Sequence, residues 1–176
     1  MFLMAKTQKQ INERLLAYKN GTVDSKYKIT KPTSYDSRFG VMEVGAIDVD
    51  KSFHAQRFDL VIDYGLWLTD DKFWIKGESA SDIPHANKFP NDWKLIKNKP
   101  ETIAKKGWIV VYKGGSYTEH GHVGIVYEDG DLNKFVTIEQ NWNGYANKKP
   151  LLRTDYYENI YYFIAPPIAP EKKEDK

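Results

Sequence analysis

Four short runs of β-branched and aromatic residues in the second half of the chain most constrain its fold. They cover residues 108–112, 123–127, 135–138 and 161–164. Turn-forming residues bound each run, which is typical of strands in a packed sheet. Gly114-Gly115 and residues 128–131 lie between runs, where hairpin loops are expected. We therefore predict four strands of an antiparallel sheet.

Two segments of the first half have helical spacing instead. Thr7 and Gln10 have the form of a capping box, and apolar residues follow at helical intervals until Gly21. Over residues 58–68 the apolar positions recur every three or four residues, so one face of a second helix is strongly apolar. Helices followed by a sheet predict an α+β fold.

The remaining segments have no sustained period. Residues 21–55 are rich in Gly, Pro, Ser, Asp and Lys, which indicates long ordered loops that need an external tie, such as a metal ion. Residues 70–105 mix short helical and loop pieces. Beyond residue 164 the Pro-containing, charged composition is that of a linker. We expect one domain over 1–166 and a linker or disordered tail over 167–176.

Composition excludes several classes of function. A net charge of +2 over 176 residues falls well short of the basic face that duplex nucleic acid demands. The absence of cysteine excludes disulfides, thiolate metal sites and thiol catalysis in this chain. No apolar stretch is long enough to cross a bilayer, and the opening residues are too short for a signal peptide. We expect a monomer with neither a nucleic-acid nor a membrane partner.

Residues 48–59 have the spacing of a calcium-binding loop. Asp48, Asp50 and Ser52 stand at positions one, three and five, and Asp59 stands at position twelve. Position six is not the glycine of an EF-hand, position twelve is not glutamate, and only one helix follows. A single calcium loop is one interpretation, in which His54 adds a backbone carbonyl or a ring nitrogen. The other is a solvated acidic turn.

A second group of polar residues lies on two of the predicted strands. His122 enters one strand, and Glu139 and Asn141 leave the next, two residues apart and so on one face. A histidine can exchange a proton near neutral pH, and an acid or amide on its other ring nitrogen fixes the tautomer. These residues could form a base with its orienting partners. Alternatively, His122 is a strand histidine satisfied by hydrogen bonds.

Such a pair needs a nucleophile, and the start of a helix favours an anionic one. Arg57 stands at the start of the second predicted helix. An arginine stays protonated and has no lone pair with which to attack a carbonyl carbon. We also expect Arg57 to lie near Glu139 and to form an ion pair with it.

Several segments resemble the CHAP domain, a papain-like cysteine, histidine-dependent amidohydrolase/peptidase, of staphylococcal-phage endolysins. The most specific segment is Glu-Gln-Asn-Trp-Asn-Gly-Tyr-Ala-Asn-Lys-Lys-Pro at 139–150, and the resemblance runs from about residue 4 to residue 166. The other similar segments are residues 21–25, 33–36, 39–43, 45–48, 54–56 and 63–70.

The resemblance implies a papain-like α+β fold and hydrolysis of bacterial peptidoglycan at an amide bond of the stem peptide or the glycine crossbridge, such as the D-alanyl-glycine bond. His122 matches the family's general base, Glu139 its orienting acid and Asn141 the accompanying amide. Arg57 stands where the family has its cysteine nucleophile. The resemblance also implies synthesis in the host cytoplasm without a signal peptide and action at the cell wall.

The resemblance further implies a structural or regulatory Ca²⁺ in the acidic loop, although a serine replaces the family's tyrosine at position 52. The matching ligand positions are Asp48, Asp50, Ser52, His54 and Asp59.

Three functions remain open for a chain with Arg57. The first is an endolysin domain inactivated at its nucleophile, whose lysis Arg57→Cys restores. The second is a non-catalytic module that binds the cell wall. The third is hydrolysis by another route, with His122 activating water directly.

Overall fold

The computed structural model describes residues 4–114, 117–142 and 144–171. Its first helix, α1, spans Gln8–Asn20. The predicted capping box is formed, because Thr7 Oγ1 accepts from Gln10 N at 3.1 Å and Gln10 Oε1 accepts from Thr7 N at 2.9 Å. The helix ends at Gly21, which adopts a left-handed conformation with φ 70° that a glycine tolerates without strain.

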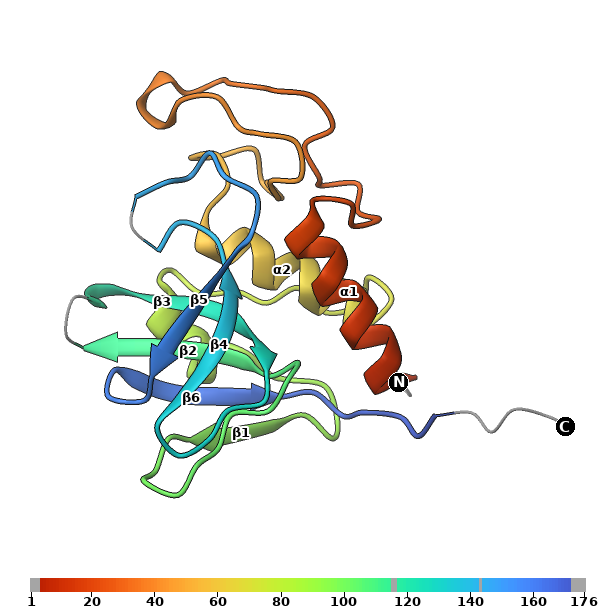
Figure 1. The fold of residues 1–176 in the computed structure, drawn as a ribbon, viewed down its shortest axis with the longest axis vertical. Coiled ribbons are helices and arrows are strands. Elements are labelled where there is room, and N and C mark those ends of the chain that lie inside the picture. The colour runs from red at the N-terminus through yellow and green to blue at the C-terminus, as the bar shows by residue number, and fades with distance from the viewer. Residues whose placement is uncertain (1–3, 115–116, 143, 172–176) are drawn as a thin grey trace, which may run out of the picture.

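The second helix, α2, spans Arg57–Leu68 and lies beside α1 (Figure 1), with most of its residues buried. A buried polar contact joins the two helices. Asp63 on α2 accepts from the Arg14 guanidinium at 2.8 Å and also from the Tyr18 hydroxyl, both on α1. The described ranges also contain three shorter helical segments: η1 (Ser37–Phe39), η2 (Ala80–Asp82) and α3 (Ile83–Ala86).

In the described part of the chain, six antiparallel strands form one sheet in the order β1-β6-β2-β3-β4-β5. The strands are β1 (Lys94–Lys97), β2 (Ile109–Gly114), β3 (Tyr117–Glu128), β4 (Lys134–Glu139), β5 (Leu151–Tyr156) and β6 (Ile160–Ala165). The four predicted strands are β2, β3, β4 and β6, so the α+β prediction is confirmed. The sequence did not predict β1 and β5, which are the two edge strands. The predicted glycine turn at 115 lies outside the described residues.

The sheet is covered differently on its two faces. Ile109 and Val111 of β2 join the main core, which includes buried residues of α1 and α2. Val110 and Tyr112 point the other way, into a smaller core with Phe135 and other side chains. Because β2 is buried on both faces, it reads as a continuous apolar run instead of an alternating one.

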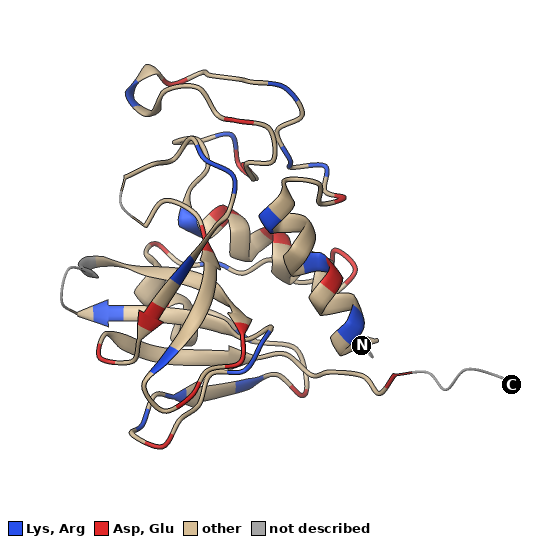
Figure 2. Ribbon diagram, viewed as in Figure 1, with Lys and Arg blue, Asp and Glu red and all other residues tan. Residues whose placement is uncertain are grey.

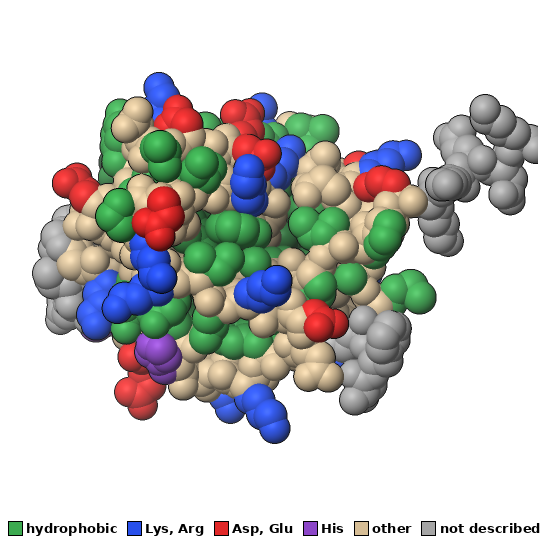
Figure 3. All heavy atoms as spheres, turned by 90° about the horizontal axis from the view of Figure 1, so that it is seen from below, with side chains coloured by type: hydrophobic (Ala, Val, Ile, Leu, Met, Phe, Trp, Pro, Cys, Tyr) green, Lys and Arg blue, Asp and Glu red, His purple; other side chains and the backbone are tan. Residues whose placement is uncertain are grey.

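Residues 21–55 form a long excursion at the top of the view in Figure 1. Two isolated antiparallel bridges, Lys28 with Ile47 and Thr33 with Met42, fold the excursion back on itself. Acidic and basic residues are both scattered along the chain (Figure 2). The face seen in Figure 3 also carries charged side chains of both signs among apolar ones. None of the helices in the described part of the chain is long and apolar enough to cross a membrane.

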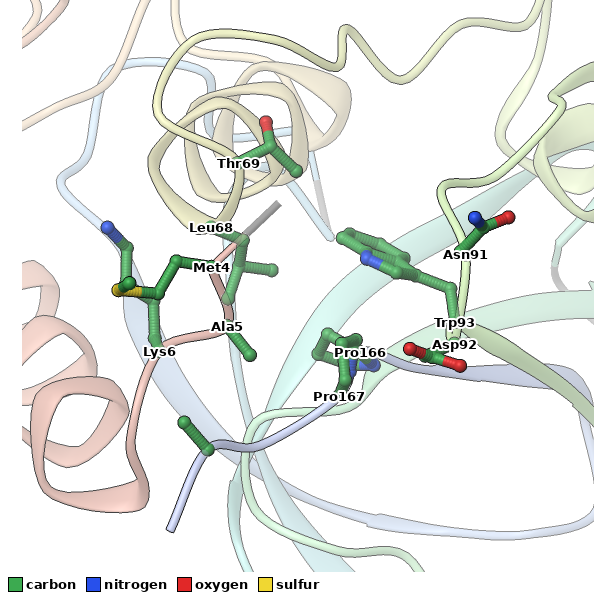
Figure 4. A pocket seen from close by; sticks show the side chains of 11 residues that line it. Met4, Ala5, Lys6, Leu68, Thr69, Asn91, Asp92, Trp93, Pro166 and Pro167 are labelled. Atoms are coloured by element: carbon green, nitrogen blue, oxygen red, sulfur yellow. The ribbon is translucent and has the colours of Figure 1, made fainter. Parts of the chain in front are cut away.

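The chain beyond β6 returns to the N-terminal segment. Ala169 N donates to Lys6 O at 2.9 Å, and Ala169 pairs with Thr7 in a parallel bridge. A pocket of about 400 Å³ opens between these segments, with Trp93 on one side and Leu68 on the other (Figure 4). Part of the expected linker is therefore docked on the domain, and residues 172–176 lie outside the described part.

Candidate functional site

Arg57 is the first residue of α2, so it stands at the start of the second predicted helix, as expected. Its guanidinium donates to two backbone carbonyls, from Nη1 to Gly121 O at 3.1 Å and from Nη2 to Asn141 O at 3.2 Å. Gly121 precedes His122 on β3, and Asn141 follows the end of β4. Arg57 therefore ties the start of α2 to both strands that carry the predicted base and acid.

His122 and Glu139 face each other across the adjacent strands β3 and β4. Nε2 of His122 lies 3.2 Å from Oε2 of Glu139, and both side chains are almost fully buried. Gly124 on β3 leaves room for this arrangement, since a Cβ there would lie 3.1 Å from Glu139 Cβ and 3.3 Å from its Oε2. The structure thus brings together the predicted base and acid.

The electrostatics of the pair favour a neutral imidazole beside an ionised carboxylate. Burial lowers the pKa of His122 below its ordinary value; contact with Glu139 opposes this, and the charges of Arg57 and Arg153 add to it. Burial alone would raise the pKa of Glu139, but its contacts with His122 and Arg153 outweigh that effect and lower it. A neutral imidazole is the form that can accept a proton.

Arg153 on β5 is a site residue that the sequence did not indicate. Its Nε donates to Glu139 Oε1 at 2.5 Å, and its Nη1 lies 3.0 Å from Asp155 Oδ2. The antiparallel register pairs Thr137 of β4 with Arg153, which brings the guanidinium to the end of the neighbouring strand. The sequence could not place Arg153 beside Glu139, because this placement depends on the pairing of β5 with β4, and β5 was not predicted.

Two predicted contacts differ in the structure. Asn141 has φ 50°, so the chain leaves the strand there and the alternation that would place it on the Glu139 face no longer applies. Its Nδ2 instead donates to Gln56 Oε1 at 2.7 Å. The expected ion pair between Arg57 and Glu139 is also wrong, since among the described residues the ion-pair partners of Glu139 are His122 and Arg153.

Gln140 was also missed, although it lies between two predicted site residues. Its side chain is buried. Its Oε1 accepts from Ile47 N at 2.9 Å, and its Nε2 donates to Ile47 O and to Gln56 O, each at 3.0 Å. One amide side chain therefore fixes the acidic loop and the start of α2 to the end of the sheet.

The acidic loop brings three of its predicted ligands together. Ligand oxygens of Asp48, Asp50 and Asp59 all lie within 4.8 Å of one another. Asp48 and Asp59 are buried, and burial together with the neighbouring carboxylates raises the pKa of Asp59 to about 8. Within the described ranges, no lysine or arginine forms an ion pair with any of the three. Hard carboxylate oxygens in such a cluster suit Ca²⁺.

The other two predicted ligands are placed differently. Nε2 of the His54 ring lies 2.8 Å from Gly40 O, and His54 is not among the residues whose ligand atoms cluster with those of the three aspartates. Ser52 N donates to Asp50 Oδ1 at 3.0 Å, which shapes the turn. Positive φ angles at Lys51, Phe53 and His54 curl the loop without a glycine.

A cleft of about 650 Å³ opens at the start of α2. Arg57 and Asn141 line it, together with aromatic walls from Phe39, Phe53 and Phe58. Phe53 belongs to the acidic loop, so the loop and the cleft share a wall.

Comparisons with known proteins find similar phage endolysins. The chain is 53% identical to the endolysin LysK of Staphylococcus phage K over 165 residues, which are 94% of this chain and 33% of the relative. It is 35% identical to the endolysin PlyTW of Staphylococcus phage Twort over 137 residues, 73% of this chain and 29% of the relative. The chain therefore spans a third or less of the length of these relatives.

Among solved structures, the fold is similar to that of the wild-type endolysin LysIME-EF1, with a TM-score of 0.66 and 23% identity over 94% of this chain and 66% of that chain. The CHAP domain model matches residues 49–141, the stretch that runs from the acidic loop through Arg57 and His122 to Asn141. The chain belongs to the CHAP domain family.

Proposed function

We propose that this chain is a peptidoglycan-hydrolase domain of the endolysin type that binds its substrate but does not cleave it, because Arg57 occupies the nucleophile position. The family and the two phage endolysins that it resembles support this class of substrate. The chain itself supplies the base, its acid and a cleft. It lacks the thiolate on which the acyl-enzyme route depends.

The observation that carries the proposal is the position of Arg57. Its two carbonyl partners, Gly121 and Asn141, lie next to His122 and two residues from Glu139. A side chain at position 57 is therefore directed at the buried histidine and acid, at the start of a helix whose backbone N–H groups favour negative charge. The guanidinium fills the place where a nucleophile would act.

In the variant Arg57→Cys the same residues would support covalent catalysis. His122 contacts Glu139 through Nε2, which makes Nδ1 the nitrogen that would take the thiol proton. The thiolate would attack the peptide carbonyl, and backbone N–H groups at the start of α2 would stabilise the oxyanion. His122 would then protonate the leaving amine, and water would release the acyl group.

The proposed substrate is the peptide part of the bacterial wall, either an amide of the stem peptide or the D-alanyl-glycine bond to the crossbridge. The cleft has aromatic walls from Phe39, Phe53 and Phe58 that suit a short peptide in extended form. Action at the cell wall follows from this substrate.

We also propose that the acidic loop binds Ca²⁺ through Asp48, Asp50 and Asp59. The three clustered carboxylates support this site. A bound cation would offset their mutual repulsion and hold the loop against the cleft, since Phe53 belongs to both. Ser52 and His54 would contribute through their backbone.

A paired assay on purified staphylococcal cell walls tests the proposal. Turbidity clearing and wall binding are measured for this protein and for Arg57→Cys, each with Ca²⁺ and with chelator. We expect both proteins to bind, and only Arg57→Cys with Ca²⁺ to clear. Clearing by the unmodified protein, abolished by His122→Ala, would contradict the proposed inactivity.

Binding by both proteins without clearing by either would instead favour a wall-binding module, the second candidate function. The observation behind that candidate is Arg57 itself. Its guanidinium cannot act as a nucleophile, and its two hydrogen bonds to backbone carbonyls hold it at the start of α2.

A further inference from the structure

Arg153 holds the acid of the proposed catalytic pair from the side opposite the histidine. Glu139 offers Oε2 to His122 at 3.2 Å and Oε1 to Arg153 Nε at 2.5 Å. Oε2 also accepts from the Thr137 hydroxyl at 3.0 Å, so Arg153 is the partner that holds Oε1. The Glu139 side chain is fully buried. A carboxylate held at both oxygens cannot rotate away from the imidazole.

We infer that Arg153 is a positioning residue that fixes Glu139, and through it the orientation and protonation of His122. The catalytic part of this inference rests on the proposed function. The contact between Arg153 and Glu139 is present in this chain whether or not the chain is an active enzyme. Arg153 lies outside the segment matched by the family model, which ends at residue 141.

Arg153 is itself held on several sides. Asp155 binds its Nη1 at 3.0 Å, and the guanidinium lies over the Tyr112 ring at 5.6 Å and over the Trp142 ring at 4.6 Å. The planar, forked guanidinium can stack on rings while it bonds a carboxylate edge-on, which a lysine ammonium cannot do. Its geometry is therefore set by packing as well as by charge.

The charges around His122 explain why the arginine matters. Glu139 on β4 favours the protonated imidazole, while Arg153 on β5 and Arg57 on α2 disfavour it, and the buried ring of Tyr112 on β2 packs against it with ring centroids 5.1 Å apart. An acid without its arginine would act on the histidine with its full negative charge. The histidine would then hold a proton that a general base must lack.

Histidine NMR on the full chain tests the positioning role without any need for activity. The ring nitrogens of His122, assigned by loss of their signals in His122→Gln, are followed over pH in the parent protein and in Arg153→Met and Arg153→Lys. We expect Arg153→Met to raise the titration midpoint of His122 and to mix its tautomers. Arg153→Lys keeps the charge, so it should mix the tautomers with a smaller upward shift.

Lys134→Met is the matched control, because it removes an exposed cation from β4, the strand of Glu139. It should leave the His122 titration unchanged. If Arg153→Met does not fold, Arg153→Lys decides by the same readout. An unchanged midpoint and tautomer in the folded Arg153 variants would overturn the inference.

A second measurement connects the role to catalysis. In the Arg57→Cys background, adding Arg153→Met should lower kcat on cell walls by about 10–100-fold, as removal of an outer partner of a functional histidine does in metal sites. KM should change little, because Arg153 does not line the cleft. No clearing by Arg57→Cys alone would refute the proposed function, while the NMR result would still decide on Arg153.

Discussion

The sheet site and the acidic loop differ in how their carboxylates are neutralised. On the sheet, the carboxylate of Glu139 is paired by two other side chains, His122 and Arg153. In the loop, the carboxylates of Asp48, Asp50 and Asp59 gather without a described lysine or arginine in an ion pair with them. The first site carries its own counter-charge, whereas the described residues give the second none, which is why we propose that a cation binds there.

The largest expected effect comes from breaking the sheet site. Glu139→Gln removes a fully buried carboxylate and leaves the half-buried Arg153 with Asp155 as its remaining counter-charge. Breaking a fully buried ion pair typically costs about 3–5 kcal/mol of unfolding free energy, so we expect a loss at the lower end, about 3 kcal/mol. Urea denaturation measures this loss. Glu128→Gln, at the exposed end of β3, is the control and should stay close to the parent. A loss of unfolding free energy close to that of the control would mean that the ion pair between Glu139 and Arg153 does not stabilise the fold.

Calcium binding should have the next largest effect on stability, and this effect should depend on the acidic loop and not on the sheet site. At a concentration 100 times Kd, binding to the folded state adds about 2.7 kcal/mol to stability. Thermal denaturation with Ca²⁺ and with chelator measures the gain. Asp48→Asn should remove most of the gain, whereas Glu139→Gln should keep it. Stabilisation of equal size in Asp48→Asn would place the ion elsewhere.

Acidic pH should weaken the sheet site. The folded-state pKa values of His122 and Glu139 are both lowered, so the unfolded chain binds more protons, and their contribution to stability is present at neutral pH and lost on acidification. Loss from His122 begins as pH falls below its unfolded value of about 6.5, with a slope of at most about 1.4 kcal/mol per pH unit.

His122→Gln should flatten the stability curve between pH 7 and pH 5, measured by denaturation at each pH. A curve of unchanged slope in this variant would show that other groups cause the acid loss.

The smallest effect is expected at the exposed end of the loop. Without calcium, Asp50→Asn should change stability by no more than about 0.5 kcal/mol, because Asp50 is exposed and its removal also relieves repulsion. The same substitution should weaken calcium binding measured by calorimetry. A clear loss of stability in chelator would mean that Asp50 has a structural role independent of the ion.

Local signals explain which parts of this structure the sequence predicted. The capping box at Thr7 and the left-handed Gly21 set the ends of α1 through contacts within a few residues. Strands β2, β3, β4 and β6 are rich in buried β-branched and aromatic residues, so composition alone reveals them.

The missed elements depend on contacts between distant residues. The edge strand β5 is largely exposed and carries Arg153 and Asp155, so it lacks an apolar pattern, and its register against β4 is a tertiary property. The turn of the chain at Asn141 likewise comes from its φ of 50°, which no spacing rule indicates. The site pair was predictable from its strands, whereas the arginine that holds it was not.

The proposal that Arg57 disables an otherwise intact site is tested most directly by the alkylation rate of the Arg57→Cys thiol by iodoacetamide at pH 6. A thiol at the start of α2 and beside His122 should be largely thiolate, and it should react about tenfold or more faster than a free cysteine. Adding His122→Gln should return the rate toward that of the free amino acid. A slow rate that His122→Gln leaves unchanged would contradict the account, because the histidine would then not act on position 57.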